Sequence, residues 1–391
     1  MSQKRKSVVR RSEMPNNPGV PLTTPISLSV MYHFENLEQQ KAVMNKEVQG
    51  YTYARYANPN STILAEKLSW MEDAKGGVIT SAGMSAISCV FLALLEKGDT
   101  IAASSQLYGQ SLKMLTKMLP RMGFKTNFFD PSDPSTFDEA ITSKTKIIFV
   151  EIMSNPVLKL THFKKLVEVA KKSSAIILVD NTFTTPIGFK PLNHGATLVM
   201  QSVTKMLSGH SDLNLGYIGT NDSKILEDID ELVANFGFNS SPFNSWLAER
   251  GLQTFELRFK RAQENAGKLA QILDKHPKIV KVNYPGLSSH PEHELAKEML
   301  NENFGTMISF VLKGDYTNID NFVKAAKDIP YGPTLGDVAT TIIVPSISSH
   351  RHLSQEERLE LGIEDTLVRI SVGIESLDII KNDLIDALEE A

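Results

Sequence analysis

Lys205 has the neighbours that a reactive lysine requires. It follows the apolar run at residues 196–200 and lies in the segment 202–212, which reads Ser-Val-Thr-Lys-Met-Leu-Ser-Gly-His-Ser-Asp. Apolar surroundings lower the pKa of an amine, and the hydroxyls of Ser202 and Thr204 could hold a phosphate beside it. An ordinary solvated lysine in a loop is the competing interpretation, which the segment alone does not exclude.

Asp180 ends a second apolar run, residues 175–179, which reads Ala-Ile-Ile-Leu-Val. Such a run is typical of a strand that is buried on both faces of a parallel sheet. Ligands of open α/β sheets bind beyond the carboxyl ends of such strands. Asp180 could cap the next helix, or it could pair with the protonated pyridine nitrogen of pyridoxal phosphate (PLP). Because Lys205 also follows a buried run, the two residues together favour a PLP site with a Schiff-base lysine.

A phosphate site is predicted where the first strand meets a helix. Residues 81–87 contain Gly83 and Met84, and a glycine at a helix start lets backbone N–H groups approach an anion. The phosphate motifs of dinucleotide-binding proteins and nucleotide hydrolases are absent from the sequence, so one phosphate is the economical inference. Tyr53 and Arg55 lie in an aromatic segment, where arginine could bind a phosphate through two hydrogen bonds. A surface turn with stacked aromatic rings is the alternative.

Two further residues are candidates for contact with a planar ring and a carboxylate. Tyr108 follows the second predicted strand and offers an aromatic face for stacking. Arg369 lies within the apolar run at 367–372, and burial of an unpaired arginine is so costly that an anion is expected beside it. The histidine pairs 290/293 and 350/352 lack the Cys or Glu neighbours of a zinc site, so we predict no metal.

Apolar runs that predict strands alternate with helical patterns over residues 58–220. This alternation indicates an α/β fold with a mostly parallel sheet and helices on both faces. Helices dominate residues 243–276, without an obvious break at Gly251, and a mixed region follows. Strands are expected at 77–80, 100–103, 126–129, 146–150, 175–180, 196–200, 215–219, 306–311 and 367–372, and helices at 37–45, 62–73, 84–96, 110–122 and 163–172.

Length and composition allow a large core without covalent links. The 391 residues carry a net charge of −4 and one cysteine, Cys89, so no disulfide framework is possible within the chain. The longest apolar run is far short of the ~20 residues of a membrane-spanning helix. The basic tail at 1–11 lacks the apolar core of a secretory signal, and no basic stripe follows it; we expect a cytoplasmic protein that binds neither membrane nor nucleic acid. The expected domains are an extended N-terminal arm (1–57), a PLP-binding α/β domain (58–256) and a smaller C-terminal α+β domain (257–391).

In combination, these segments resemble the cystathionine γ-synthase-like family of PLP enzymes, the Cys/Met-metabolism group, from about residue 21 to the C-terminus. The likeness implies the PLP-dependent transferase-like fold (fold type I) and an obligate homodimer, usually paired into a tetramer. It implies that Lys205 forms the imine with the cofactor and that Asp180 pairs with its ring nitrogen. The other implied roles are ring stacking for Tyr108; phosphate contact for Gly83, Met84, Ser202 and Thr204, and from the neighbouring subunit for Tyr53 and Arg55; contact near the cofactor's phenolic oxygen for Asn155; and substrate binding for Arg369, Thr334 and Asn155.

The resemblance leaves the exact reaction open. Many γ-synthases and γ-lyases carry a glutamate where this chain has Ala339, and methionine γ-lyases usually carry a cysteine where it has Gln110. We expect a carbon–sulfur lyase that acts on a small sulfur-containing amino acid and favours β-elimination of cystathionine to homocysteine, pyruvate and ammonia. Lys205 is the expected general base, and Tyr108 would protonate the departing sulfur if the cofactor environment lowers its pKa. Racemisation is an expected side activity, if Cα is reprotonated on its other face. Cystathionine γ-synthase, cystathionine or methionine γ-lyase, homoserine-ester sulfhydrylase and a non-catalytic binding protein are the alternatives.

Overall fold

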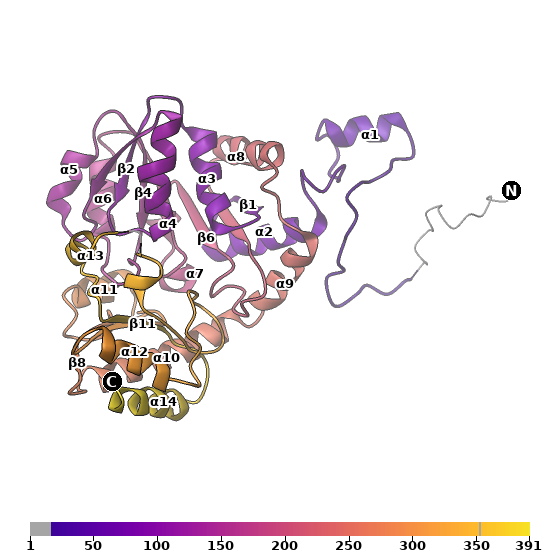
Figure 1. Ribbon diagram of the computed structural model, residues 1–391. Helices are drawn as coiled ribbons and strands as arrows, with labels where there is room; N and C mark the ends of the chain where they lie inside the picture. The colour runs from indigo at the N-terminus through magenta and orange to yellow at the C-terminus, as the bar shows by residue number, and fades with distance from the viewer. Residues whose placement is uncertain (1–16, 352) are drawn as a thin grey trace.

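The computed structural model describes residues 17–351 and 353–391; the predicted basic tail and His352 lie outside these ranges. Two sheets with their helices make up the body, and an arm extends from it (Figure 1). Among the described residues, no helix is both long and apolar enough to cross a membrane.

The larger sheet has seven strands, in the order β1-β7-β6-β5-β4-β2-β3. Their bounds are β1 (Gly76–Thr80), β2 (Thr100–Ser104), β3 (Lys125–Phe129), β4 (Thr145–Glu151), β5 (Ile176–Asp180), β6 (Leu198–Ser202) and β7 (Gly216–Thr220). The five strands from β3 to β6 are parallel, and β7 pairs antiparallel with both β6 and β1. The predicted mostly parallel sheet is confirmed, and its strands agree with the apolar runs to within two residues at each end.

Helices cover both faces of this sheet because its central strands are apolar on both sides. In β4, Ile147 and Phe149 pack into the core formed with α3, whereas Ile148 and Val150 pack into the core formed with α2 and α6. The bounds of the helices around this sheet are α2 (Pro59–Glu72), α3 (Gly83–Leu94), α4 (Gly109–Lys113), α5 (Phe137–Ala140), α6 (Phe163–Ala170), α7 (Thr185–Gly188), α8 (Ser223–Phe236) and α9 (Pro242–Leu252).

The smaller sheet is antiparallel, in the order β10-β11-β9-β8, and has a core of its own. Its strands are β8 (Ile279–Asn283), β9 (Met307–Leu312), β10 (Thr341–Ile343) and β11 (Leu367–Ser371), and its helices are α10 (Phe255–Leu273), α11 (His293–Leu300), α12 (Tyr316–Ala325), α13 (Gln355–Glu360) and α14 (Leu377–Glu389). Residues from α10, α12 and α14 pack into that core. This arrangement confirms the expected α+β region and the fold type I architecture.

Two expectations about helices were wrong. The helical region at 243–276 is interrupted between α9 and α10, where the carbonyl of Gly251 accepts a hydrogen bond from Arg258. The helix expected at 110–122 is α4 followed by one π-helical and one 3-10 turn, and Pro120, which lacks an N–H, lies in the last of these. Asn58 caps the start of α2, with Pro59 at the first helical position.

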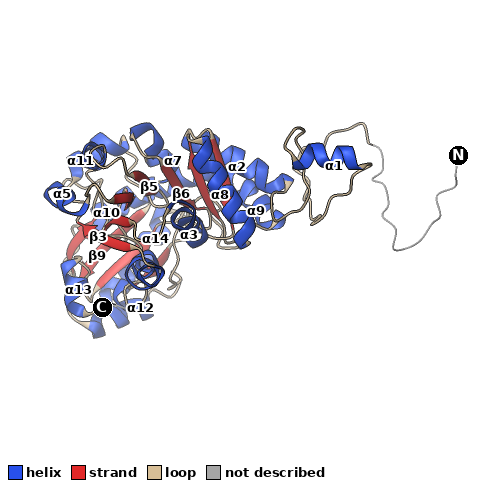
Figure 2. Ribbon diagram, turned by 90° about the horizontal axis from the view of Figure 1, so that it is seen from above, coloured by secondary structure: helices blue, strands red, loops and turns tan. Residues whose placement is uncertain are grey.

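The described part of the arm, residues 17–57, extends away from the body and carries the short helix α1 (Leu37–Met44) (Figure 2). Hydrogen bonds attach its base: the side chain of Asn60 donates to the carbonyl of Pro25, and the indole of Trp246 donates to that of Thr24. An isolated bridge between Met31 and Tyr53 folds the arm back on itself. The predicted extended arm is therefore present in the described residues.

Candidate active site

A cavity of about 590 Å³ is lined by the carboxyl ends of β4, β5 and β6 and by loops of the C-terminal α+β region. Every predicted site residue except Tyr53 and Arg55 lines this cavity. The predicted residues brought together are Gly83, Met84, Tyr108, Asn155, Asp180, Ser202, Thr204, Lys205, Thr334 and Arg369. Residues far apart in the sequence therefore meet at the sheet edge where ligands of α/β folds bind.

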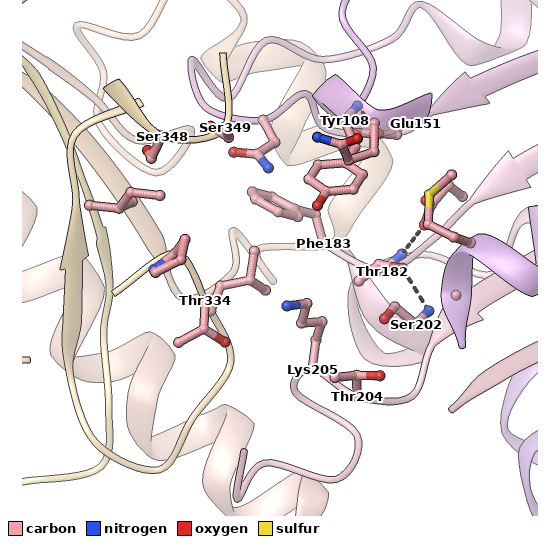
Figure 3. A pocket seen from close by; sticks show the side chains of 18 of the residues that line it. Tyr108, Glu151, Thr182, Phe183, Ser202, Thr204, Lys205, Thr334, Ser348 and Ser349 are labelled. Atoms are coloured by element: carbon pink, nitrogen blue, oxygen red, sulfur yellow. Dashed lines mark hydrogen bonds between the residues drawn. The ribbon is translucent and has the colours of Figure 1, made fainter. Parts of the chain in front are cut away.

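Lys205 lies in a tight turn directly after β6. Its amine projects into the cavity between Thr334 on one side and Thr182 and Ser202 on the other (Figure 3). Burial lowers the pKa of this amine, and the positive charge of Arg369 lowers it further. A larger share of neutral amine results, which is the form that attacks a carbonyl or accepts a proton.

A pair of carboxyl groups forms the floor of the cavity. Asp180 is the last residue of β5, and Glu151 lies beside it at the end of the parallel strand β4. Asp180 accepts a hydrogen bond from the backbone N–H of Thr182 at 3.0 Å, and Glu151 accepts one from that of Tyr108 at 2.6 Å. Burial raises the pKa of Asp180 to about 6. Burial and then the charge of Asp180 raise the pKa of Glu151 well above its usual range, so Glu151 holds the proton and Asp180 the charge.

Glu151 was not predicted from the sequence. A signal was available, because it ends the apolar run of residues 147–150 as Asp180 ends that of 175–179. The run continues through Ile152 and Met153, however, so the sequence alone does not show where the strand ends.

The start of α3 provides a cradle for a phosphate. No side chain caps this helix, whose first residue is Gly83. A Cβ atom on Gly83 would lie 2.9 Å from Cβ of Ser202, so only glycine lets the helix start approach β6 so closely. Uncapped N–H groups at a helix start favour an anion, and the hydroxyl of Ser202 lies beside them. The hydroxyl of Thr204 is instead engaged by the backbone of Leu215 at 3.0 and 3.2 Å.

Arg369 lies in the middle of β11, is buried and forms no ion pair with any described residue. Its guanidinium donates to Oδ1 of Asn155 at 2.8 Å and to the carbonyl of Thr334 at 2.7 Å. Its Nε is buried without a partner. Burial lowers the pKa of Arg369 to about 10, which is still cationic at neutral pH. An anion in the cavity would compensate this charge, as the sequence predicted.

Tyr108 lines the cavity with its ring partly exposed, above the end of the Lys205 side chain in Figure 3. Burial raises the pKa of its phenol, and the positive charge of Arg369 opposes this effect. The lowering of the Tyr108 pKa that is expected from the cofactor environment stays a prediction. The phenol retains its proton at neutral pH and is available as a donor.

Tyr53 and Arg55 lie in the arm, outside this cavity. Arg55 donates to the carbonyl of Ala234 and lies 4.8 Å from the ring centroid of Tyr56. Their expected contact with a phosphate of the neighbouring subunit stays a prediction. Ala339, where many γ enzymes carry a glutamate, does not line the cavity either. The side chain at this position therefore gives no support for one reaction over another.

The residues present fit PLP. A half-buried amine, a half-buried carboxylate at a strand end and an uncapped helix start that could hold an anion share one cavity. These groups could hold the aldehyde carbon, the ring nitrogen and the phosphate of the cofactor, respectively. Arg369, on the smaller sheet, would remain free for the carboxylate of an amino acid.

Comparison with known proteins agrees with this chemistry. The family model for Cys/Met metabolism PLP-dependent enzymes matches residues 7–389. A cystathionine gamma-lyase of Bacillus subtilis is 38% identical over 92% of this chain and 93% of its own length. A cystathionine beta-lyase of Coxiella burnetii is 39% identical over 87% of this chain and 88% of its own. The crystal structure of cystathionine gamma synthase from Xanthomonas oryzae in complex with cystathionine superposes with a TM-score of 0.89, at 35% identity, and covers 94% of this chain and 93% of that one.

The fold and the site define a PLP-dependent enzyme of fold type I. The chain belongs to the family of Cys/Met metabolism PLP-dependent enzymes, the group of cystathionine β-lyases, γ-lyases and γ-synthases. Its relatives divide among these activities at similar identity, so membership establishes the chemistry of trans-sulfuration and the cofactor but not the bond that is cleaved.

Proposed function

We propose that this chain is a carbon–sulfur lyase that cleaves cystathionine at Cβ, consuming one water and releasing homocysteine, pyruvate and ammonia. The observation that carries the proposal is that Lys205, Asp180 and Arg369 line the same cavity. They supply a base, a partner for the ring nitrogen and a clamp for the substrate carboxylate. When bound, PLP accepts the electrons that are released when the proton leaves Cα.

Each side chain then has one task. Arg369 binds the α-carboxylate and orients the substrate. The amine of Lys205, whose pKa is lowered by burial, takes the proton from Cα. Asp180 keeps the ring nitrogen protonated, and the phenol of Tyr108 donates a proton to the departing thiolate. Return of the first proton to the opposite face of Cα would racemise an amino acid without a leaving group, such as L-alanine.

Cleavage at Cβ is favoured because it requires one proton abstraction, from Cα, and Lys205 is placed to perform it. Cleavage at Cγ asks the same amine for a second proton, from Cβ. The relatives named as γ-lyases support γ-cleavage as the second candidate, with cysteine and 2-oxobutyrate as products.

Analysis of the keto acid formed from cystathionine tests the proposal. We expect pyruvate and homocysteine in equal amounts from the wild-type protein loaded with PLP, and no keto acid from Lys205→Ala. Formation of 2-oxobutyrate and cysteine instead would show that the protein cleaves cystathionine at Cγ and not at Cβ. If neither keto acid forms while Lys205 binds PLP, the protein is not a cystathionine lyase, and activated homoserine with a thiol becomes the substrate to supply.

A further inference from the structure

Arg258 is a buried cation that the candidate reaction does not use. It lies in the second turn of α10, with only 9% of its surface exposed, and forms no ion pair with any described residue. Burial lowers its pKa to about 10, and the charge of Asp337 opposes this effect. Because a buried charge without a counterion is costly, the contacts of this guanidinium call for an explanation.

Those contacts lead to the turn that carries Lys205. Nη1 of Arg258 donates to the carbonyl of Met206 at 2.8 Å, and Nη2 donates to that of Leu207 at 3.0 Å. No backbone N–H among the described residues donates to either carbonyl. They are buried acceptors that the backbone of this short turn leaves unpaired, and the guanidinium satisfies both together. Arg258 therefore fixes the two residues that directly follow Lys205.

The guanidinium is itself held in place from α9 and its own helix. Nη2 also donates to the carbonyl of Gly251 at 2.9 Å, and Nε donates to the hydroxyl of Thr254 at 3.1 Å. These two acceptors lie at the junction of α9 and α10, where the helical region at 243–276 is interrupted. The interruption lets one side chain connect this junction to the Lys205 turn.

Glycines allow the backbone to close around the same turn. A Cβ atom on Gly209 would lie 2.0 Å from Nη1 of Arg258, and one on Gly336 would lie 2.5 Å from the backbone nitrogen of Met206. Both glycines have positive φ angles, of +75° and +78°. The loop containing Gly336 also contains Thr334, whose carbonyl accepts a hydrogen bond from Arg369. The loop that contacts Arg369 through Thr334 therefore also packs, through Gly336, against the turn that carries Lys205.

We propose that Arg258 is a positioning residue for Lys205: its guanidinium holds the carbonyls of Met206 and Leu207 so that the amine points into the cavity. It acts through the backbone and touches neither cofactor nor substrate. The inference rests on the proposed function, because it assumes that Lys205 is the lysine that binds PLP and transfers the proton.

The test compares Arg258→Lys and Arg258→Ala with the matched controls Arg261→Lys and Arg261→Ala. Arg261 is on the exposed side of the same helix and makes only a 3.4 Å contact with the carbonyl of Glu375. We expect both Arg258 variants to lower kcat by about 10- to 100-fold, because a displacement near 1 Å at a reacting group has an effect of that size, with KM changed by less than about threefold. Millimolar guanidinium ion should restore part of the kcat of Arg258→Ala and leave both controls unchanged.

Two readouts separate the possible failures. Borohydride reduction followed by mass spectrometry shows whether Lys205 carries the pyridoxyl group; if wild-type Lys205 does not, the proposed function fails and not the inference. If wild-type Lys205 is labelled and folded Arg258→Lys keeps the wild-type kcat, Arg258 has no positioning role. A fall in melting temperature without a fall in kcat, or a kcat of Arg258→Ala that guanidinium does not raise, identifies Arg258 as a merely structural residue and overturns the proposal.

Discussion

Two neighbouring carboxyl groups at the floor of the cavity have different charges, although both end buried parallel strands. Asp180 and Glu151 lie side by side, and two negative charges in such a place would repel each other at low dielectric. Burial raises the pKa of both, and the charge of Asp180 raises that of Glu151 in addition. Asp180 therefore carries the charge that a protonated ring nitrogen requires, while Glu151 supports the backbone of Tyr108 as a neutral acid.

Replacing the carboxyl group by an amide should have little effect on activity at Glu151 and a large effect at Asp180. Glu151→Gln keeps an oxygen for the N–H of Tyr108 and the neutral form that burial favours, so we expect kcat/KM within about threefold of wild type. Asp180→Asn removes the charge that keeps the ring nitrogen protonated, and we expect a loss of at least about 100-fold. Steady-state kinetics on cystathionine at neutral pH measure both. A large loss in Glu151→Gln would show that Glu151 acts as an anion.

The sequence predicts residues whose position follows from a local pattern. Lys205 and Asp180 both follow apolar runs, so the strand rule locates them at the binding edge, and Arg369 is conspicuous as a charge within such a run. Glu151 obeys the same rule but is hidden by the apolar residues after it. Arg258 has no local signal for this role, because the carbonyls of Met206 and Leu207 lie about 50 positions earlier and only the folded chain brings them to its guanidinium.

At the level of elements, a buried network fixes α2 to the strands that lead into the site. Glu72, the last residue of α2, accepts hydrogen bonds from Asn181 at 3.2 Å and from Gln201 at 2.6 Å. Asn181 follows β5 directly after Asp180, and Gln201 is in β6, four residues before Lys205. Burial raises the pKa of Glu72 to about 7, so the carboxyl group is protonated in slightly acidic solution.

This raised pKa predicts a pH-dependent stability. The folded protein binds a proton at Glu72 that the unfolded chain releases near pH 4.5, so the stabilisation is complete below that pH and is lost as the pH rises through about 7. The loss at higher pH is on the order of 3 kcal/mol in the free energy of unfolding. Glu72→Gln keeps the accepting oxygen and cannot ionise. We expect urea unfolding at about pH 5 and about pH 8.5 to show a smaller loss for the variant than for wild type; equal losses would contradict the raised pKa.

Element boundaries were predictable wherever apolar periodicity decides them and not where distant contacts do. The alternation of runs and amphipathic stretches located the strands of the large sheet because each strand is buried on both faces. The break between α9 and α10, where Arg258 contacts Gly251, and the π-helical turn after α4 have no comparable pattern in the sequence.

For the whole molecule, the arm is the feature that a single chain leaves unexplained. Val20 and Leu22 on the arm have relative exposures of 88% and 106%, and the arm extends away from the body in both views (Figures 1 and 2). Exposed apolar side chains on an extended segment favour packing against another copy of the chain. We therefore propose a homo-oligomer of paired dimers, in which Tyr53 and Arg55 of one protomer serve the phosphate of the other.

Hybrid dimers test whether Arg55 acts on the neighbouring site. Lys205→Ala and Arg55→Met should each be inactive or nearly so as homodimers, the first for want of the base and the second for want of a phosphate ligand. In a hybrid of the two, one site would combine the intact Lys205 of one protomer with the intact Arg55 of the other. Co-refolding equal amounts forms hybrids as about half of the dimers, so we expect about a quarter of the wild-type activity on cystathionine. If Arg55 served its own chain, both sites of the hybrid would lack a residue, and mixing would restore nothing.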